Sequence, residues 1–445
     1  MMSDTVCCIG DTQTQLMFHR ISNALDLTRR RDEGMDKLSR RDMLRAGGTL
    51  GAFGALSIAT PAEARVWTWS PSGSVVGTGA GLDPRWVWDP EADTLVASLI
   101  DRGEVPRVNT LLRTWTKNGQ PLPAGLPADL KAFMEKARQL PAWADRGKIA
   151  AAADFNDRRG LYTGVLYGFA SGMMSTVIPK EARAVYYSQG GADMQDRISK
   201  TAKLGYDIGT RNAYDADGEM IVTCVKTRLA HAAVRHLLPK SPHWQGSADE
   251  DIPISQADMM VTWHSLPTTV MKNLLAWKVP MPAADSAAFL HTWQLAAYML
   301  GIKEEYIPAS WAEANSQAKQ VLDPVLAPTP EGIKLANILL ELGATIDAGL
   351  LTKRVLGSLT RFMLGDKIAG WLSIPRYPLW DGLLNTFWGP FIAVREGLLK
   401  VFPGADSTYW LFDELLRKVL LAYLSGAQQI SIEIPLTNNP NYPDS

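Results

Sequence analysis

The sequence predicts an all-α protein in which most of the chain forms one large helical domain. From Leu126 onward, apolar residues recur at the 3.6-residue spacing of helices that pack against a core, and proline or glycine separates most of these segments. Apolar residues make up 46% of the 445-residue chain and charged residues 20%, which allows a sizeable core. Only segment 430–434 has the character of a strand. We therefore expect a central helical bundle with additional peripheral helices.

The first element along the chain is an N-terminal export signal. Segment 39–44, SRRDML, carries a twin-arginine motif, a weakly apolar run follows at 47–60, and AEA at 62–64 is an A-x-A cleavage site. Residues 1–64 are thus predicted to be an N-terminal extension and signal peptide, with Met35 as an alternative start, and residues 65–445 a single all-α domain. We expect the twin-arginine machinery to export the folded protein to the periplasm, the outer surface or the medium.

The mature chain is expected to begin irregularly and then to become helical. Residues 65–123 are rich in proline, glycine and tryptophan and have few periodic segments, so we expect an irregular lead-in. The tail after 436 is polar and predicted to be loose. The helices are expected near 127–139, 145–177, 192–208, 218–238, 255–277, 283–301, 308–325, 330–348, 351–373, 378–401 and 407–426.

Composition and motifs exclude several functions. The net charge of −1 gives no electrostatic basis for binding nucleic acid or an anionic membrane. No mature segment has about 18 uninterrupted apolar residues, so no membrane span is predicted. There is no nucleophile elbow, no phosphate loop and no HExxH zinc motif. Removal of the signal leaves Cys224 as the only cysteine, so a haem could not be attached through a CxxCH motif. We expect a monomer.

The predicted helix from Asp217, as its N-cap, to Pro239 carries the candidate cofactor site. Arg228, His231 and Arg235 stand at i, i+3 and i+7 and share one helical stripe, flanked by small alanines. This arrangement leaves room for a flat group such as haem, with His231 as the axial ligand and the arginines on its propionates. The alternative remains open that His231 is a hydrogen-bonded core histidine and that both arginines pair with carboxylates.

A second cluster precedes that helix. Arg197, Lys200 and Thr201 share one face of the predicted helix 192–208, and Glu181 lies upstream of them. A buried lysine or glutamate there would have a shifted pKa suited to moving a proton near a bound oxygen molecule. The alternative is a solvated helix face held by salt bridges.

These residues resemble the latex-clearing proteins, which are b-type haem rubber oxygenases within a wider family of haem-dependent oxygenases. The pattern Arg228-x-x-His231-x-x-x-Arg235 matches the wider family's signature. Trp263-His264 matches a second family histidine, segment 298–302 resembles a recurring helix end, and Arg361 stands where another family arginine is expected. The resemblance covers most of residues 127–427.

The resemblance implies a globin-like helical core around one non-covalently bound haem b. It makes His231 the proximal iron ligand, Lys200 the distal ligand of a closed state, and Glu181 the base, with Arg197 and Thr201 lining the site. The cofactor-binding residues are expected to be His231, Lys200, Arg228, Arg235, His264 and Arg361. A salt bridge to Glu181 is the alternative role for Lys200.

The resemblance also implies a reaction. Family members use O2 to cleave poly(cis-1,4-isoprene) within the chain, and the products carry an aldehyde at one end and a ketone at the other. Two alternatives remain: an oxygenase that cleaves the prenyl side chain of a smaller terpenoid, and an extracellular globin-like haem carrier. The carrier would use His231 but would not need Glu181.

Overall fold

The computed structural model describes residues 73–77, 82–245, 252–345, 352–401, 413, 425–426 and 429–442. These residues belong to a compact unit, Trp69–Ser445, that is separate from Met1–Thr68. The predicted export signal at 39–64 lies outside the described residues, as does most of the helix expected at 407–426.

The predicted all-α class is confirmed, since the regular elements of the described residues are helices. Ten of the eleven expected helical segments hold a helix or a chain of helices at the expected place. The helices are α3 (Pro90–Asp101), α4 (Val105–Leu112), α5 (Ala128–Ala137), α6 (Arg146–Leu166), α7 (Gly172–Ser175), α8 (Pro179–Tyr187), α9 (Met194–Asp207), α10 (Met220–Leu237), α11 (Pro242–Gln245), α12 (Gln256–Trp263), α13 (Thr269–Ala276), α14 (Ala283–Met299), α15 (Trp311–Val321), α16 (Pro330–Gly343), α17 (Lys353–Trp371) and α18 (Pro378–Val401).

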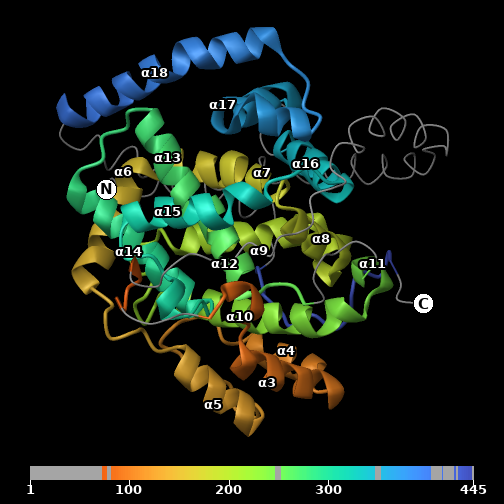
Figure 1. The fold of residues 1–445 in the computed structure, drawn as a ribbon. Coiled ribbons are helices and arrows are strands. Elements are labelled where there is room, and N and C mark those ends of the chain that lie inside the picture. Colours follow the sequence, from red (N-terminus) through yellow and green to blue (C-terminus); the bar gives the residue numbers. More distant parts are fainter. Residues whose placement is uncertain are drawn as a thin grey trace, which may run out of the picture. The chain divides into compact units, whose positions relative to one another are not determined.

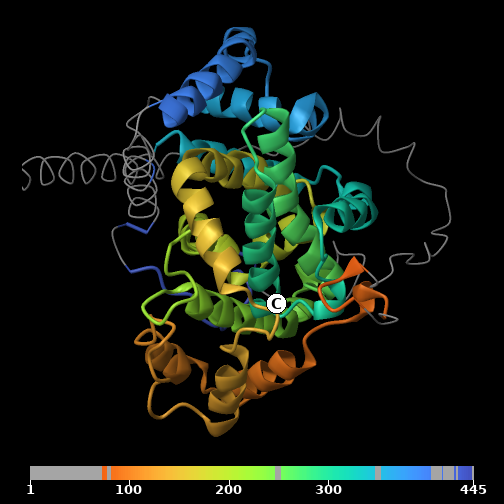
Figure 2. The same cartoon turned by 90° about the vertical axis from the view of Figure 1, so that its left-hand side faces the viewer.

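The helices around α10 form the part of the fold that positions the site. In Figure 1, α10 runs across the lower half of the compact unit, with α3, α4 and α5 below it and α8, α9 and α12 above it. The perpendicular view in Figure 2 keeps this order and places α18 at the opposite edge, beyond α17. The main packing pairs are α6 with α14, α10 with α3, and α17 with α18.

No described helix is by itself both long and apolar enough to cross a membrane. One pair of successive helical segments meets that length and composition when taken together, but the angle between the two segments is 91°. The pair is Arg146–Ser175 and Pro179–Tyr187.

Four parts of the chain differ from the sequence prediction. Helices α8 and α11 were not predicted. The tail expected to be loose is held by the buried side chains of Asn438 and Asn439, which donate to the carbonyls of Leu237 at 2.9 Å and Tyr186 at 2.7 Å. The other two are the lead-in and the expected strand.

The lead-in at 65–123 contains α3 and α4, because the Asp89 side chain accepts a hydrogen bond from the Ala92 amide at 3.4 Å and Pro90 occupies the first helical position. The strand predicted at 430–434 is wrong: within the described residues it has no partner strand. The Asn109 side chain instead bonds both the amide and the carbonyl of Ile434, each at 2.9 Å.

Two predicted helices are interrupted by wide turns near the core. Tyr167–Ser171 (η5) follows α6, and His264–Thr268 (η8) lies between α12 and α13; both are π-helical. A π-turn inserts an extra residue into the helical ladder and often occurs at functional sites. The two turns contact one another, so the irregular backbone is gathered in one place.

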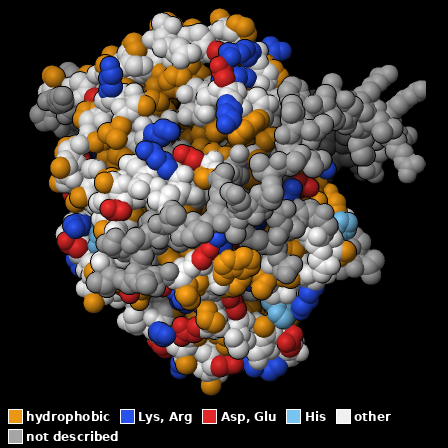
Figure 3. Space-filling model, in the orientation of Figure 1, with side chains coloured by type: hydrophobic (Ala, Val, Ile, Leu, Met, Phe, Trp, Pro, Cys, Tyr) orange, Lys and Arg blue, Asp and Glu red, His pale blue; other side chains and the backbone are white. Residues whose placement is uncertain are grey.

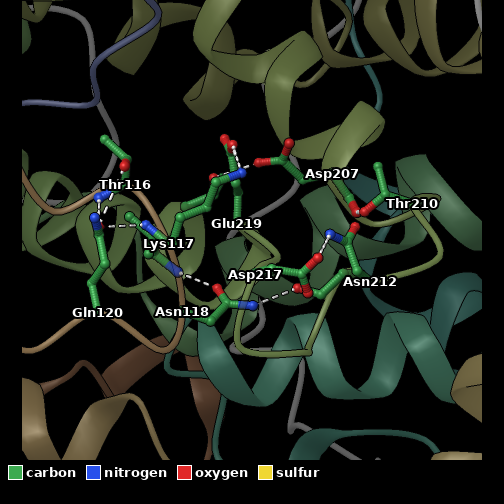
Figure 4. A network of polar contacts seen from close by, with 12 residues as sticks. Thr116, Lys117, Asn118, Gln120, Asp207, Thr210, Asn212, Asp217 and Glu219 are labelled. Carbon is green, nitrogen blue, oxygen red and sulfur yellow. Dashed lines mark hydrogen bonds and ion pairs between the residues drawn. The ribbon is translucent and has the colours of Figure 1, made fainter.

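The start of α10 is fixed by a distant side chain. The predicted N-cap, Asp217, is wrong: the helix begins after Glu219, and Asp217 accepts a hydrogen bond from Asn212 at 3.0 Å. Asn118 Oδ1 instead accepts the amides of Ile221 at 3.0 Å and Val222 at 3.4 Å. Figure 4 shows Asn118 on its own segment, reaching toward this network. Asn118, which lies about a hundred positions upstream, therefore caps the helix by accepting hydrogen bonds from its first free amides.

The same network ties α9 to the beginning of α10. Lys203 on α9 lies 2.6 Å from Glu219 and 2.9 Å from Asp207, and Lys117 lies 2.7 Å from the other oxygen of Glu219. Thr223 on α10 donates a hydrogen bond to the buried Asp207 at 2.6 Å. Lys117, Asp207 and Glu219 converge in Figure 4. These bonds fix the C-terminal end of α9, the helix that carries Arg197, against α10.

Candidate functional site

His231 is the central residue of the site. It lies in the middle of α10, and among the described residues neither of its ring nitrogens has a hydrogen-bond partner. Burial lowers the pKa of His231 to about 3, and the charges of Arg235 and Arg197 lower it further while Asp89 opposes them. The imidazole is therefore neutral at ordinary pH and has a free lone pair, which is the state needed to bind a metal.

Glu181 is the candidate base of the site. It stands in the first turn of α8, and its Oε2 accepts a hydrogen bond from Thr262 of α12 at 3.1 Å. Burial raises the pKa of Glu181 to about 7, while the Thr262 hydrogen bond and the Arg197 charge work against that rise. Near neutrality the carboxyl is then divided between its two protonation states, where a proton acceptor is most useful.

Arg197 connects the two groups electrostatically. Its charge acts on both Glu181 and His231, and burial lowers its own pKa. The side chains of Glu181, Arg197 and His231 are each surrounded by protein, yet each keeps part of its surface accessible. The three side chains, on α8, α9 and α10, therefore form one electrostatically coupled group.

The two arginines of the α10 stripe are held by α3. Arg228 donates to both oxygens of Asp89, at 2.6 and 2.9 Å, and Arg235 Nε donates to Asp93 at 2.6 Å. The alternative in which the arginines pair with carboxylates is therefore what the geometry shows. Gly301, at φ +94°, makes room for this pairing, since an added Cβ would lie 2.8 Å from Arg228 Nε.

Arg235 nevertheless keeps a free donor. Its Nη2 is buried and has no hydrogen-bond partner, although Nη1 reaches the Ile254 carbonyl at 3.3 Å. An unpaired buried guanidinium N–H is costly, and an anionic group placed beside it would remove that cost. The unpartnered imidazole of His231 and this donor lie one helical turn apart on the same stripe. Together they fit a haem, through one axial ligand and one propionate.

Lys200 and Thr201 lie on α9 with other partners. Lys200 Nζ is 2.6 Å from Asp196 Oδ2, one turn earlier, and its side chain is 29% exposed. Thr201 is exposed, and its hydroxyl donates to the Arg197 carbonyl at 3.1 Å. The distal-ligand role of Lys200 and the site-lining role of Thr201 remain predictions from the family resemblance.

His264 and Arg361 are held by the protein itself. His264 is fully buried; its Nδ1 lies 2.9 Å from Thr268 Oγ1 and its Nε2 lies 2.7 Å from Gln317 Oε1. Arg361 lies 2.8 Å from Asp366 and donates to the Ile374 carbonyl at 2.7 Å. Both ring nitrogens of His264 are occupied, so the geometry gives this residue a packing role and does not assign it to the cofactor.

Sequence reasoning missed Thr262, Asp89 and Asp93. No local pattern marks Thr262, because it meets Glu181 only through the packing of α12 on α8. The two aspartates had a usable signal: Asp89 precedes a proline, and an acidic residue follows at Asp93. That pattern marks the start of a helix, and such a start could have been considered for pairing with the arginine stripe.

The fold and the site together define an all-α protein in which a neutral histidine and a carboxyl poised for proton transfer are both acted on by the charge of the same arginine, Arg197. The catalytic-domain model of the family described as ER-bound oxygenase mpaB/B'/Rubber oxygenase matches residues 158–391. The chain belongs to this family of oxygenases, and it is therefore an enzyme of the oxidoreductase class.

Two relatives narrow the comparison. A protein named rubber oxygenase from Streptomyces sp. (strain K30) is 55% identical over 409 residues, which are 92% of this chain and 100% of the relative. The solved structure titled "Structure of Latex Clearing Protein LCP in the closed state" is similar with a TM-score of 0.76 at 55% identity, and the match covers 83% of this chain and 99% of that one. The resemblance to the latex-clearing proteins is thereby confirmed.

Proposed function

We propose that this protein is a haem b-dependent dioxygenase that cleaves poly(cis-1,4-isoprene) with O2. The observation that carries the proposal is the pair formed by His231 and Glu181: a buried imidazole without a partner and a buried carboxyl with a pKa near 7. The relative named rubber oxygenase supports the substrate, and the twin-arginine motif supports export, because a polymer cannot enter a cell.

The residues of the site would hold the cofactor in a defined way. His231 would ligate the iron through its neutral imidazole, and the unpaired Nη2 of Arg235 would bind a propionate. Arg228 is already paired with Asp89, so its role is to fix α10 against α3. When bound, the haem would supply the iron that binds and activates O2.

Glu181 would act as the base of the cleavage. Polyisoprene has no polar handle, and an allylic proton must leave as the new C–O bond develops. Glu181 Oε1 has no hydrogen-bond partner among the described residues and remains available, while Oε2 is held by Thr262. The Arg197 charge favours the ionised carboxylate and opposes the effect of burial. The carboxyl therefore stays close to the balance between its two protonation states, where it can take up and release a proton.

A product assay tests the substrate. The purified, haem-loaded protein is incubated under air with polyisoprene latex and, separately, with a farnesyl compound, and carbonyl products are derivatised and measured. We expect oligo-isoprenoids with one aldehyde and one ketone end from latex only. Carbonyl products from the farnesyl compound alone would instead identify a terpenoid side-chain oxygenase.

The non-enzymatic haem carrier has less support. A carrier needs His231 but has no use for a buried carboxyl with a pKa near 7, and the matched family is described as oxygenases. Reversible oxygen binding without any carbonyl product from either substrate would favour the carrier.

A further inference from the structure

Helix α18 exposes its apolar residues. Among the described side chains, thirteen large hydrophobic residues are exposed, and six of them lie on this one 24-residue helix. Five of them, from Phe387 to Val401, are spaced three or four residues apart and make one continuous stripe about 21 Å long, and Leu379 lies about two helical turns before it. Hydrophobic side chains are visible in Figure 3 over the upper part of the molecule, where Figure 1 places α18. The six residues, called here the α18 stripe, are Leu379, Phe387, Phe391, Val394, Leu398 and Val401.

The inner face of α18 carries the charges. Arg395 and Glu396 are both buried, and each is paired: Arg395 lies 2.6 Å from Asp413, and Glu396 lies 2.8 Å from Arg159 of α6. Trp388 and Ile392 complete the contact with the body, Trp388 by packing its ring against Trp277 with centroids 4.9 Å apart.

This arrangement is the reverse of an ordinary surface helix. Such a helix buries its apolar stripe and exposes its charges, because burying an ion costs more than burying a hydrocarbon. The two ion pairs fix the orientation of α18, since rotating it to bury Val394 would expose Arg395 and Glu396 without their partners. The fold therefore holds the apolar stripe outward. An exposed apolar patch of this length marks a binding surface.

We propose that the α18 stripe is the surface by which the enzyme adsorbs to the hydrocarbon of its polymer particle. The charge pattern carries this assignment: between 382 and 398, the described exposed side chains of α18 include no charged group. A lipid bilayer presents charged or zwitterionic headgroups, and basic residues usually accompany the apolar face of a helix that binds one. An uncharged apolar stripe instead matches a partner without polar groups. The inference rests on the proposed rubber-cleaving function.

Adsorption can be measured without catalysis. The haem-loaded mature protein is mixed with washed polyisoprene particles under argon, the particles are floated by centrifugation, and the protein in each layer is quantified. We expect Leu379→Ser/Phe387→Ser/Val394→Ser to lower the partition onto particles about tenfold or more, because three large apolar contacts are lost. The same variant should cleave a detergent-dispersed isoprene oligomer at the parental rate, since α18 carries none of the proposed catalytic residues.

A matched control substitutes equally exposed apolar residues elsewhere. Leu82→Ser/Trp86→Ser/Val325→Ser changes three exposed residues that lie outside α18, and it should partition like the parent. Circular dichroism and the melting temperature confirm that both variants are folded, and the single variant Val394→Ser replaces the triple if the triple does not fold.

Several results would overturn the proposal. The first is equal partition of the α18 variant and the parent onto the particles. The second is binding of the parent to phosphatidylcholine vesicles that is equally strong and depends on the residues of the α18 stripe. The third is a dimer of the parent whose dissociation depends on those residues. Adsorption that requires the stripe, in a protein that yields no carbonyl products, would support the surface and refute the proposed reaction. Cleavage of the polymer by a protein whose adsorption does not depend on the α18 stripe would support the proposed reaction and refute the proposed surface.

Discussion

Two buried histidines of this protein, in different regions, show what burial does and does not reveal. His231 on α10 and His264 in the π-turn η8 are both enclosed by protein, and burial lowers their pKa values to about 3 and about 4. His264 has a partner for each nitrogen, in Thr268 and Gln317, whereas His231 has none. Burial alone therefore makes both imidazoles neutral. The missing partners distinguish the one available to bind a cofactor.

The same contrast extends to their surroundings. The Arg197 charge acts on both His231 and Glu181, and these titratable side chains keep part of their surface accessible. The partners of His264 are a hydroxyl and an amide. The side-chain amide of Gln317 in turn donates a hydrogen bond to the Tyr306 carbonyl at 3.0 Å. A closed network of neutral groups stabilises a core. An open set of titratable groups supplies reactivity.

The largest expected effect separates the two histidines directly. His231→Ala should abolish haem binding, so the Soret band of the purified protein should disappear. His264→Ala should keep the haem in its folded fraction but lower the free energy of unfolding by about 2–4 kcal/mol, because it leaves Gln317 Oε1 unpaired and opens a cavity. Absorbance spectra and urea unfolding measure the two effects. A normal Soret band in His231→Ala would remove this residue from the ligand role.

The second effect concerns the base. Glu181→Gln should keep the haem and the adsorption to latex but lose about 10²–10⁴ in oxygen consumption. In the parent, kcat/KM should rise with pH through about 7, because the carboxyl must lose its proton before it can accept one from the substrate. This rise of kcat/KM with pH should be absent in Glu181→Gln. Turnover of the variant within about threefold of the parent would mean that the proton leaves to another group.

A third effect is the response of stability to acid. The folded-state pKa of His264 is lowered, so the unfolded chain binds more protons between pH 6.5 and about 4, and the stability due to this group is lost as the pH falls through that range. At pH 5 the loss amounts to on the order of 2 kcal/mol. His264→Gln should therefore show a smaller fall in urea midpoint between pH 7.5 and 5 than the parent. An equal fall in both proteins would assign the acid sensitivity to other groups.

The smallest effect tests Lys200. If this side chain is the distal ligand, Lys200→Ala should shift the Soret and visible bands from a six-coordinate toward a five-coordinate or water-bound form without loss of haem. Asp196→Asn, which removes the 2.6 Å partner seen here, should favour ligation and leave the six-coordinate spectrum in place. Unchanged spectra in Lys200→Ala would leave the lysine as a partner of Asp196 only.

Local sequence determined most of the secondary structure and one side of the site. The periodicity placed α5 to α7, α9, α10 and α12 to α18 within a few residues, because helical spacing depends on neighbours within a dozen positions. It did not place the short helices α8 and α11. The i, i+3, i+7 spacing placed Arg228, His231 and Arg235 on one stripe for the same reason. The prediction failed at α3 and α4, where start signals rather than periodicity mark the helices, and at 430–434, where Asn109 takes the place of a partner strand.

Only the tertiary structure decided what those side chains do. Arg228 is bound by Asp89, 139 residues away, and Glu181 is bound by Thr262, 81 residues away. Such partners are set by how helices pack, and packing depends on the summed burial of many side chains rather than on any local pattern. The sequence thus determined by itself that a histidine stands between two arginines on one face. The fold decided that the arginines are paired by the protein, and that His231 is left free.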